Sequence, residues 1–318
     1  MGRQKAGDDG ASRGTIVLAG ATGAIGVPLV RSLVAAGRSL VVLTRRPAEA
    51  AAALPAGVAV AAWTGTGVDP AWAERLRGAH AVVNLAGANV GTRPWTRRRM
   101  ALIRSSRVRS TEALVEAIAG LQPGDRPRVL LNASGIDVYG DRGDEIVTER
   151  SEPGASFLAE VCRGWEEAAR GAEVLGTRVV LLRIPLVVSR RALALRLLAL
   201  PFRVGLGGPI GSGDQWLSWV HLSDTVALIR FALEREEIAG PLNVAAPDPR
   251  PQREVAALIG SILGRPARVR APAAALRLIL REQAAIVLQG QRALPEKALA
   301  AGYRFRYPVL AGALREAL

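Results

Sequence analysis

The sequence predicts an α/β protein, in which a doubly wound parallel sheet is followed by a smaller, mainly helical C-terminal region. Three observations support this fold class. Short apolar segments alternate with segments of helical periodicity up to residue 184. Several of the apolar segments are hydrophobic throughout, as is typical of parallel strands buried on both faces. A glycine-rich turn joins the first apolar segment to the first helical one.

The first part of the chain supplies the sheet and the helices that cover it. The predicted strands are 15–19, 39–43, 58–63, 80–84, 128–133 and 178–184. The predicted helices lie near 26–36, 47–53, 70–77, 96–119 and 155–175. Strands and helices that alternate in this way form right-handed crossovers, which place helices on both faces of a parallel sheet.

The first strand passes directly into a glycine-rich turn, GATGAIG over 20–26, and then into a helical segment. Glycine allows a tight turn and a close approach of the backbone to a pyrophosphate, and a helix N-terminus attracts negative charge. The sequence therefore predicts a Rossmann dinucleotide-binding domain over 14–185, preceded by a disordered lead-in over 1–13. The expected cofactor-binding residues of this turn are Gly20, Thr22, Gly23, Ala24, Ile25 and Gly26.

The end of the second strand distinguishes between NAD and NADP. An acid at this position would accept the ribose hydroxyls, whereas an arginine accommodates a 2′-phosphate. The chain reads Thr44-Arg45-Arg46 at the end of this strand, and the first acid after the strand is Glu49. Because a guanidinium binds phosphate through paired hydrogen bonds, these residues predict NADP(H) as the cofactor.

The regular alternation ends after residue 185. A helix is expected over 192–200, and further helices are expected over 224–236, 252–263, 273–289, 296–301 and 309–317. The loop 205–213 holds five glycines and is interpreted either as a connector or as a mobile lid. Segments 186–218 and 249–318 are expected to form the substrate domain, while 219–248 return to the first domain.

Composition excludes several classes of function. The net charge is +14, but the basic residues are scattered arginines without interleaved aromatic residues, so nucleic acid is not expected as a partner. No apolar run approaches the ~18 residues of a membrane span. The single cysteine, Cys162, excludes an internal disulfide and a multi-cysteine metal site, and it favours a reducing cytoplasm. The oligomeric state is left open.

Several motifs together carry a family resemblance that covers nearly the whole chain from residue 14. They are GATGAIG (20–26), NLAG (84–87), SRVRSTEALVEAI (106–118), YGDRGDE (139–145), FLAEVCRGWEEAA (157–169), PFRVGLGGPIGSGDQWLSWVHLSD (201–224), NVAAP (243–247) and GYRFRYPVL (302–310). The chain resembles an extended, atypical short-chain dehydrogenase/reductase. More narrowly, it is similar to the "epimerase family" subgroup that ends in a helical domain of unknown function.

The resemblance implies further cofactor-binding residues. Leu85, Ala86 and Gly87 follow the fourth strand, where small residues allow the cofactor to approach. The resemblance also places Arg107 near the cofactor and Val187 near the nicotinamide, although Arg107 is equally well interpreted as a surface residue. Two departures from the subgroup concern the adenine and nicotinamide contacts. The chain reads Trp63-Thr64 where Trp-Asp is usual, and Arg183-Ile184-Pro185 where relatives have a Thr-Gly pair.

Catalysis in this class needs a tyrosine with a lysine four residues later, and this chain has no such pair. Alignment of the 155–170 helix on Glu166 puts Leu158 and Cys162 at those two positions. The remaining polar candidates are Ser134, which could hold a substrate carbonyl, and Tyr139, which could donate a proton. Each has a structural alternative, a strand-end turn for Ser134 and a buried ring for Tyr139.

Three further features receive structural interpretations. We interpret His221 chiefly as a framework residue and Cys162 as a packed one, and we expect Asp224, or else Ser223, to begin the following helix. Asp141, Asp144 and Glu145 are interpreted as a solvated acidic loop. Trp216 and Trp219 are expected to line the cleft or to pack the domain junction.

The sequence thus predicts an NADP(H)-binding oxidoreductase or epimerase-like protein that acts on a small carbonyl or sugar-like substrate. The alternative is a catalytically silent NADP(H)-binding sensor or partner-binding protein, because fold alone does not imply function.

Overall fold

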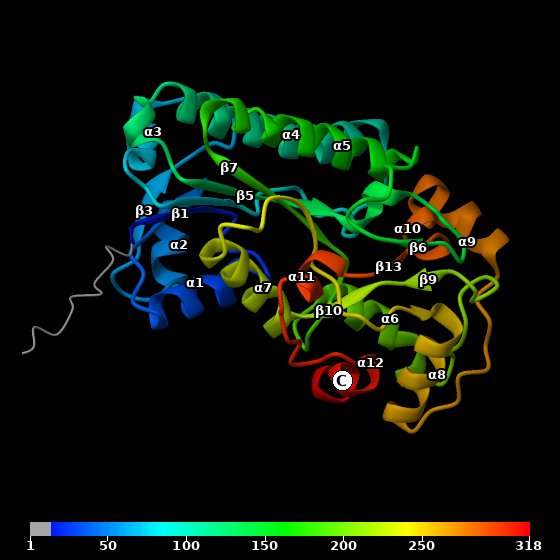
Figure 1. Cartoon of the computed structure of the whole chain (residues 1–318). Coiled ribbons are helices and arrows are strands. Elements are labelled where there is room, and N and C mark those ends of the chain that lie inside the picture. Colours follow the sequence, from blue (N-terminus) through cyan, green and yellow to red (C-terminus); the bar gives the residue numbers. More distant parts are fainter. Residues whose placement is uncertain (1–13) are drawn as a thin grey trace, which may run out of the picture.

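The computed structural model describes residues 14–318, so the lead-in expected over 1–13 lies outside the described residues. A parallel sheet of seven strands runs through the centre of the molecule in the order β11-β7-β5-β4-β1-β2-β3 (Figure 1). The strands are β1 (Ile16–Ala19), β2 (Leu40–Thr44), β3 (Ala59–Ala62), β4 (Ala81–Asn84), β5 (Val129–Gly135), β7 (Arg178–Ile184) and β11 (Gly240–Asn243). The six predicted strands and the doubly wound parallel fold are confirmed. The seventh, β11, pairs with β7 after a long excursion of the chain.

Helices cover both faces of this sheet (Figure 1). One face carries α1 (Gly26–Ala35), α2 (Pro47–Ala53) and α7 (Leu222–Glu234); the other carries α3 (Pro70–Ala73), α4 (Arg97–Ala119) and α5 (Phe157–Arg170). Leu29 and Leu228 are fully buried on the first face, and Leu114 and Ile118 on the second. Burial of a side chain of this size stabilises the fold by about 1.5–3 kcal/mol, so the apolar faces of the helices hold both layers on the sheet.

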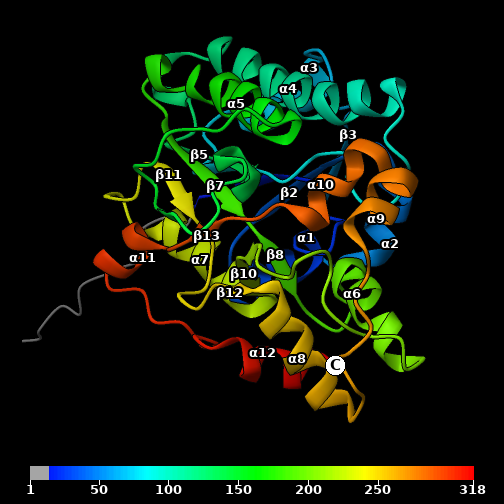
Figure 2. The same ribbon diagram turned by 90° about the vertical axis from the view of Figure 1, so that its right-hand side faces the viewer.

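The C-terminal region packs around a third core. This core is formed by α6 (Leu193–Arg203), α8 (Gln252–Leu263) and α12 (Leu310–Ala317), whereas α11 (Glu296–Ala300) packs beside β11, with Ala298 buried in the core of the first sheet face. Figure 2 shows α6, α8 and α12 at the opposite end of the molecule from α4 and α5. Trp219, Phe202, Val255 and Leu314 are buried together there, which supports the packing role expected for Trp219.

Three pairs of short strands were not predicted. They are β8 (Leu186–Val188) with β10 (Trp219–His221), β9 (Trp216–Leu217) with β12 (Arg250–Pro251), and β6 (Ile146–Val147) with β13 (Arg292–Ala293). Each strand has only two or three residues, too few to show a period of two in the sequence.

The single helix predicted over 273–289 is wrong. The structure divides it into α9 (Ala273–Leu280), the 3₁₀ turn η5 (Arg281–Ala284) and α10 (Ala285–Leu288). Arg281 has a φ of 50°, the only positive φ of a non-glycine residue in 14–318. A residue with a positive φ cannot continue an α-helix, and arginine carries no sequence signal for that conformation.

The predicted start of α7 is also wrong. The helix begins at Leu222, and its N-cap is His221, whose Nδ1 accepts the Ser223 N–H at 3.2 Å. Asp224 instead accepts the backbone N–H groups of Arg306 and Tyr307, at 2.8 and 2.9 Å. Its carboxylate thus ties the C-terminal segment to α7, a long-range contact that capping rules do not predict.

The glycine-rich loop 205–213 follows α6 and is bonded along its length. Gly207 O accepts the Val269 N–H at 3.1 Å, Pro209 O accepts the Ala271 N–H at 2.9 Å, and Ile210 N–H donates to Gln252 Oε1 at 2.8 Å. These bonds favour the connector interpretation over the lid.

Candidate functional site

The turn between β1 and α1 is built so that only glycine fits at its two ends. Gly20 has a φ of +80°, and a Cβ there would lie 2.6 Å from the carbonyl group of Leu85. A Cβ on Gly26 would lie 2.3 Å from Gly20 O. Within residues 14–318, the backbone N–H groups of Thr22 and Ala24 have no acceptor. The turn therefore offers free donors beside a helix N-terminus, which suits an anionic group.

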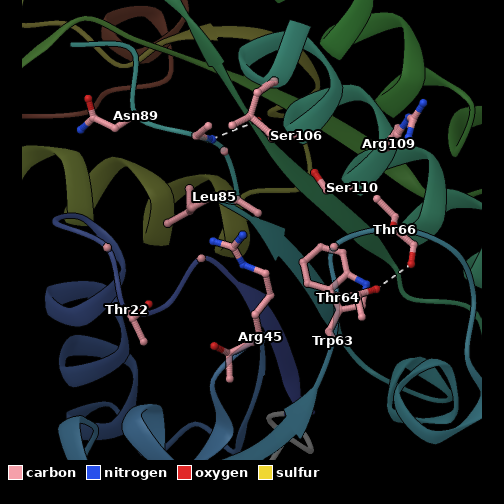
Figure 3. Close-up of a pocket in the computed structure, with 18 of the residues that line it drawn as sticks. Thr22, Arg45, Trp63, Thr64, Thr66, Leu85, Asn89, Ser106, Arg109 and Ser110 are labelled. Atoms are coloured by element: carbon pink, nitrogen blue, oxygen red, sulfur yellow. Dashed lines mark hydrogen bonds between the residues drawn. The ribbon is translucent and has the colours of Figure 1, made fainter. Parts of the chain in front are cut away.

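A pocket of about 730 Å³ opens beside this turn, at the carboxyl ends of the first four strands (Figure 3). We call it the cofactor pocket. Nine residues that the sequence predicted to bind the cofactor line it: Gly20, Thr22, Gly23, Thr44, Arg45, Arg46, Leu85, Ala86 and Gly87. Figure 3 shows the Arg45 side chain extending from the end of β2 toward Leu85. The structure thus brings these three separate segments to one cavity.

The other predicted residues lie outside the lining. Ala24, Ile25 and Gly26 belong to the turn and to the start of α1, and Val187 lies in β8. Arg107 is behind the pocket wall. It donates to Ala88 O at 2.9 Å and to Ile103 O at 3.0 Å, and its guanidinium carbon lies 5.0 Å from the centre of a Trp165 ring.

The sequence analysis missed one wall of the pocket, which α4 supplies. Arg99, Leu102, Ser106 and Arg109 line the cavity from this helix. They are spaced by three or four residues and therefore share one helical face. That spacing is the signal in the sequence, but it lies among the scattered arginines to which the sequence analysis assigned no ligand. Asn89 and Arg93, in the loop before α4, have no comparable pattern.

The cofactor pocket is strongly basic. Its lining includes five arginines and no carboxylate; the arginines are Arg45, Arg46, Arg93, Arg99 and Arg109. Two buried nitrogens in the lining, Trp63 Nε1 and Arg99 Nε, have no hydrogen-bond partner in the described chain. Unpaired buried donors are costly, so a ligand that accepts hydrogen bonds would relieve them. Free turn N–H groups, arginines and unpaired donors together fit a phosphate-rich dinucleotide.

The structure has a second pocket, of about 400 Å³, which we call the acidic pocket. Its lining is Trp95, Asp137, Ser156, Phe157, Leu158, Glu160, Glu282, Ala285, Gln289 and Gln291. The loop before α4 separates the two cavities, since Asn89 lines one and Trp95 the other. Val90 O accepts the Trp95 Nε1–H at 2.8 Å and a Gln283 amide N–H at 3.4 Å. Residues 282–291 of the C-terminal region thus form one side of this pocket.

Ser134 and Tyr139 line neither pocket. Both are buried in a network around Arg183, which binds Glu166 through two bonds of 2.9 Å. Ser134 Oγ donates to Glu166 Oε1 at 2.8 Å. The Tyr139 hydroxyl accepts from Arg183 at 2.8 Å and donates to Asn243 Oδ1 at 2.8 Å.

The environment of this network does not activate the tyrosine. Burial raises the pKa of Tyr139, against the lowering effect of the Arg183 charge and hydrogen bond. The sequence offered no signal for the Arg183–Glu166 pair, because its two residues come from β7 and α5.

Three other sequence candidates have structural partners. His221 is buried, its Nε2 lies 3.0 Å from Glu316 Oε2, and its ring packs on Tyr307. Burial raises the pKa of the Cys162 thiol to about 12, so the reactive thiolate is disfavoured. In the acidic loop, Asp144 accepts a hydrogen bond of 2.7 Å from Trp216 Nε1.

The described chain contains no group of three or more His, Cys, Asp or Glu side chains that could hold a metal ion. Within the same residues, no helix combines the length and the apolar character that a membrane crossing requires.

Comparison with known proteins identifies two matching family models. The NAD-dependent epimerase/dehydratase family matches residues 16–245, and a domain of unknown function, DUF1731, matches residues 271–317. The epimerase family protein SDR39U1 homolog, chloroplastic, of Arabidopsis thaliana is 38% identical and covers 96% of this chain and 86% of its own length. Epimerase family protein MT2273 of Mycobacterium tuberculosis is 34% identical, with 94% of this chain and 96% of the relative covered.

The chain is also similar to proteins of known structure. The human epimerase family protein SDR39U1 (isoform 2), crystallised with NADPH, is 31% identical and superposes with a TM-score of 0.82 over 95% of this chain and 98% of its own. MoeE5 in complex with UDP-glucuronic acid and NAD superposes with a TM-score of 0.73 over 96% and 97% of the two chains. Its 20% identity shows the shared fold alone.

Proposed function

This chain belongs to the NAD-dependent epimerase/dehydratase family, and from that premise we propose that it binds NADP(H) and acts as an oxidoreductase or epimerase-like enzyme on a small carbonyl or sugar-like substrate. The observation that carries the proposal is the cofactor pocket, with five arginines and no carboxylate around the glycine turn. The NADPH in the human relative's structure supports the choice of NADP(H), whereas more distant neighbours were solved with NAD.

Each wall of the pocket has a proposed role. The N–H groups of the 20–26 turn would hold the pyrophosphate. Arg45 and Arg46 would bind the 2′-phosphate beside Thr44, and Trp63 would direct its unpaired Nε1–H to an acceptor on the cofactor. When bound, the nicotinamide supplies or accepts a hydride. Leu85, Ala86 and Gly87 would lie along it, and Ala86 and Gly87 would leave room because their side chains are short or absent.

We also propose that the chain divides into a cofactor-binding part and a substrate-enclosing part. Residues 14–185 with 219–248 would hold the cofactor, and 186–218 with 249–318 would enclose the substrate. The acidic pocket supports this division, because Glu282 and Gln291 meet residues of α5 there. The lone buried Cys162 supports the cytoplasm as the compartment.

Cofactor preference tests the proposal directly. In titration calorimetry NADPH should bind more tightly than NADH. Arg45→Ala should weaken NADPH by about 1.5–3 kcal/mol, the worth of a hydrogen bond to a charged group, and should change NADH little. Arg31→Ala is the control, since Arg31 is exposed on α1 outside the pocket. Equal affinities of the wild-type protein for the two cofactors would contradict the proposal.

Ser134 and Tyr139 remain the proposed proton-transfer residues, although their hydroxyls are bonded within the Arg183 network. Once a substrate is found by screening carbonyl compounds for NADPH oxidation, Tyr139→Phe should lower kcat at least about tenfold and leave NADPH affinity unchanged. An unchanged kcat with a loss of stability would assign Tyr139 to the framework.

A silent NADP(H)-binding protein is the second candidate function. It is favoured by the absence of a Tyr–Lys pair on α5, where Leu158 and Cys162 stand. NADPH binding at micromolar affinity, without turnover of any compound in a broad screen, would select it.

A further inference from the structure

The acidic pocket differs in charge from the rest of the molecule. Its lining contains three carboxylates, Asp137, Glu160 and Glu282, and no lysine, arginine or histidine. The chain as a whole carries a net charge of +14. Within residues 14–318, none of the three carboxylates forms an ion pair with a basic side chain. Three unpaired acids around one cavity, in a chain this rich in arginine, indicate a ligand of positive charge.

Asp137 is the most buried of the three, since it is half-buried whereas Glu160 and Glu282 are exposed. Burial raises the pKa of Asp137, partly offset by its own backbone N–H and by the charge of Arg107. Arg107 does not pair with it, because that guanidinium donates to Ala88 O and Ile103 O and lies over Trp165. A cation in the pocket would offset the free-energy cost of burying this unpaired carboxylate.

Two aromatic rings provide the apolar side of the pocket. Trp95 and Phe157 meet edge to face with their centroids 5.1 Å apart, and the bond from Trp95 Nε1 to Val90 O fixes the indole. The faces of aromatic rings attract cations, and indole does so most strongly. An unpaired carboxylate beside fixed aromatic rings is a combination that recognises organic ammonium groups.

The same pocket is unsuited to an anion, although the N-terminus of α5 borders it. Ser156 caps this helix by accepting the Ala159 N–H at 3.2 Å, and Glu160 occupies the first turn. The positive end of the helix is therefore already neutralised. A nucleoside diphosphate sugar would meet three carboxylates in a cavity without a basic side chain.

We infer that the acidic pocket binds a small organic cation, a compound with an ammonium group, with its charged nitrogen against Asp137 and its apolar part against Trp95 and Phe157. That this ligand is the substrate rests on the proposed function. The volume of about 400 Å³ is that of a small-molecule site.

Binding of benzyltrimethylammonium tests the inference. Titration calorimetry should detect this cation, and benzyl alcohol and benzoate should bind at least about tenfold more weakly. Asp137→Asn should weaken the cation at least about tenfold, and Phe157→Leu should weaken it severalfold. Glu167→Gln is the matched control, because Glu167 is exposed on α5 outside the pocket. Benzoate binding as tightly as the cation, or full affinity in Asp137→Asn, would overturn the inference.

Two further measurements keep the result interpretable. NADPH affinity should be unchanged in Asp137→Asn, which shows that the variant is folded. If it is not folded, a pH titration of Glu160→Gln/Glu282→Gln should show cation affinity falling as pH falls through the raised pKa of Asp137. The groups facing Asp137, Arg107 and Cys162, do not change charge over that range. A flat profile overturns the inference, whereas failure of NADPH to bind the wild type counts against the proposed function alone.

Discussion

Asp137 shows how a single residue in a binding pocket can oppose the stability of the fold. Its pKa is raised in the folded chain because the carboxylate is buried without an ionic partner. A carboxyl group whose pKa is raised on folding favours the folded state most at low pH. That contribution is fully present below the unfolded-state pKa and is lost as pH rises through the folded-state pKa.

Asp137→Asn should therefore be more stable than the wild type at about pH 8, and its advantage should shrink as the pH is lowered toward about 5. Thermal unfolding followed by circular dichroism at both pH values checks this. Glu167→Gln, which removes an exposed carboxylate from α5, should show no such dependence. A variant less stable than the wild type at about pH 8 would show that Asp137 has a stabilising partner.

At the scale of the element, the packing of α1 against the turn after β1 requires a residue without a Cβ atom at position 26. A Cβ on Gly26 would lie 2.3 Å from Gly20 O, in backbone that cannot move independently. Gly26→Ala should therefore destabilise the protein by about 1–3 kcal/mol, as overpacking does, and should abolish NADPH binding. Gly312→Ala is the control: Gly312 lies in α12 with nothing within 4 Å of an added Cβ, so the change should stabilise the chain by up to about 1 kcal/mol. Chemical denaturation measures both.

The elements that could be predicted from the sequence are those whose signal lies within a short segment. Long apolar segments and the 20–26 turn carry their signal locally, so six strands and nine pocket residues were predicted. The positive φ at Arg281 and the cap at His221 are local, but neither residue type signals that role, and the pairing of β6 with β13 joins distant segments. No local pattern records such contacts.

In the candidate site, too, some residues could be predicted from the sequence and others could not. Residues of the cofactor pocket that follow strands could be predicted, because strand ends meet at one edge of a parallel sheet. The acidic pocket could not, since Trp95, Asp137 and Glu282 come from three distant parts of the chain. Ser134 and Tyr139 were singled out by motif position, but the Ser134 hydroxyl donates to Glu166 of α5 and the Tyr139 hydroxyl accepts from Arg183 of β7.

At the scale of the whole molecule, the net charge of +14 attracts anionic ligands electrostatically before they bind. A cofactor with several phosphates is attracted over distances that salt shortens. The association rate of NADPH should fall by roughly tenfold as ionic strength rises from about 0.02 M to about 0.3 M. Stopped-flow fluorescence of the nicotinamide measures it. The association rate of NADH, which lacks the 2′-phosphate, should fall less over the same range. An NADPH association rate that does not change with salt would contradict this role of the arginines.

The position of β11 has a consequence for how the chain is made. β7 ends at Ile184, and its outer neighbour in the sheet begins at Gly240. During translation about 55 residues must emerge before that edge can be covered, which takes on the order of 3–10 s at about 5–20 residues per second. Throughout that interval an apolar strand presents unpaired N–H and C=O groups to other nascent chains. The ribosome-bound intermediate, rather than the finished protein, is therefore where aggregation competes with folding.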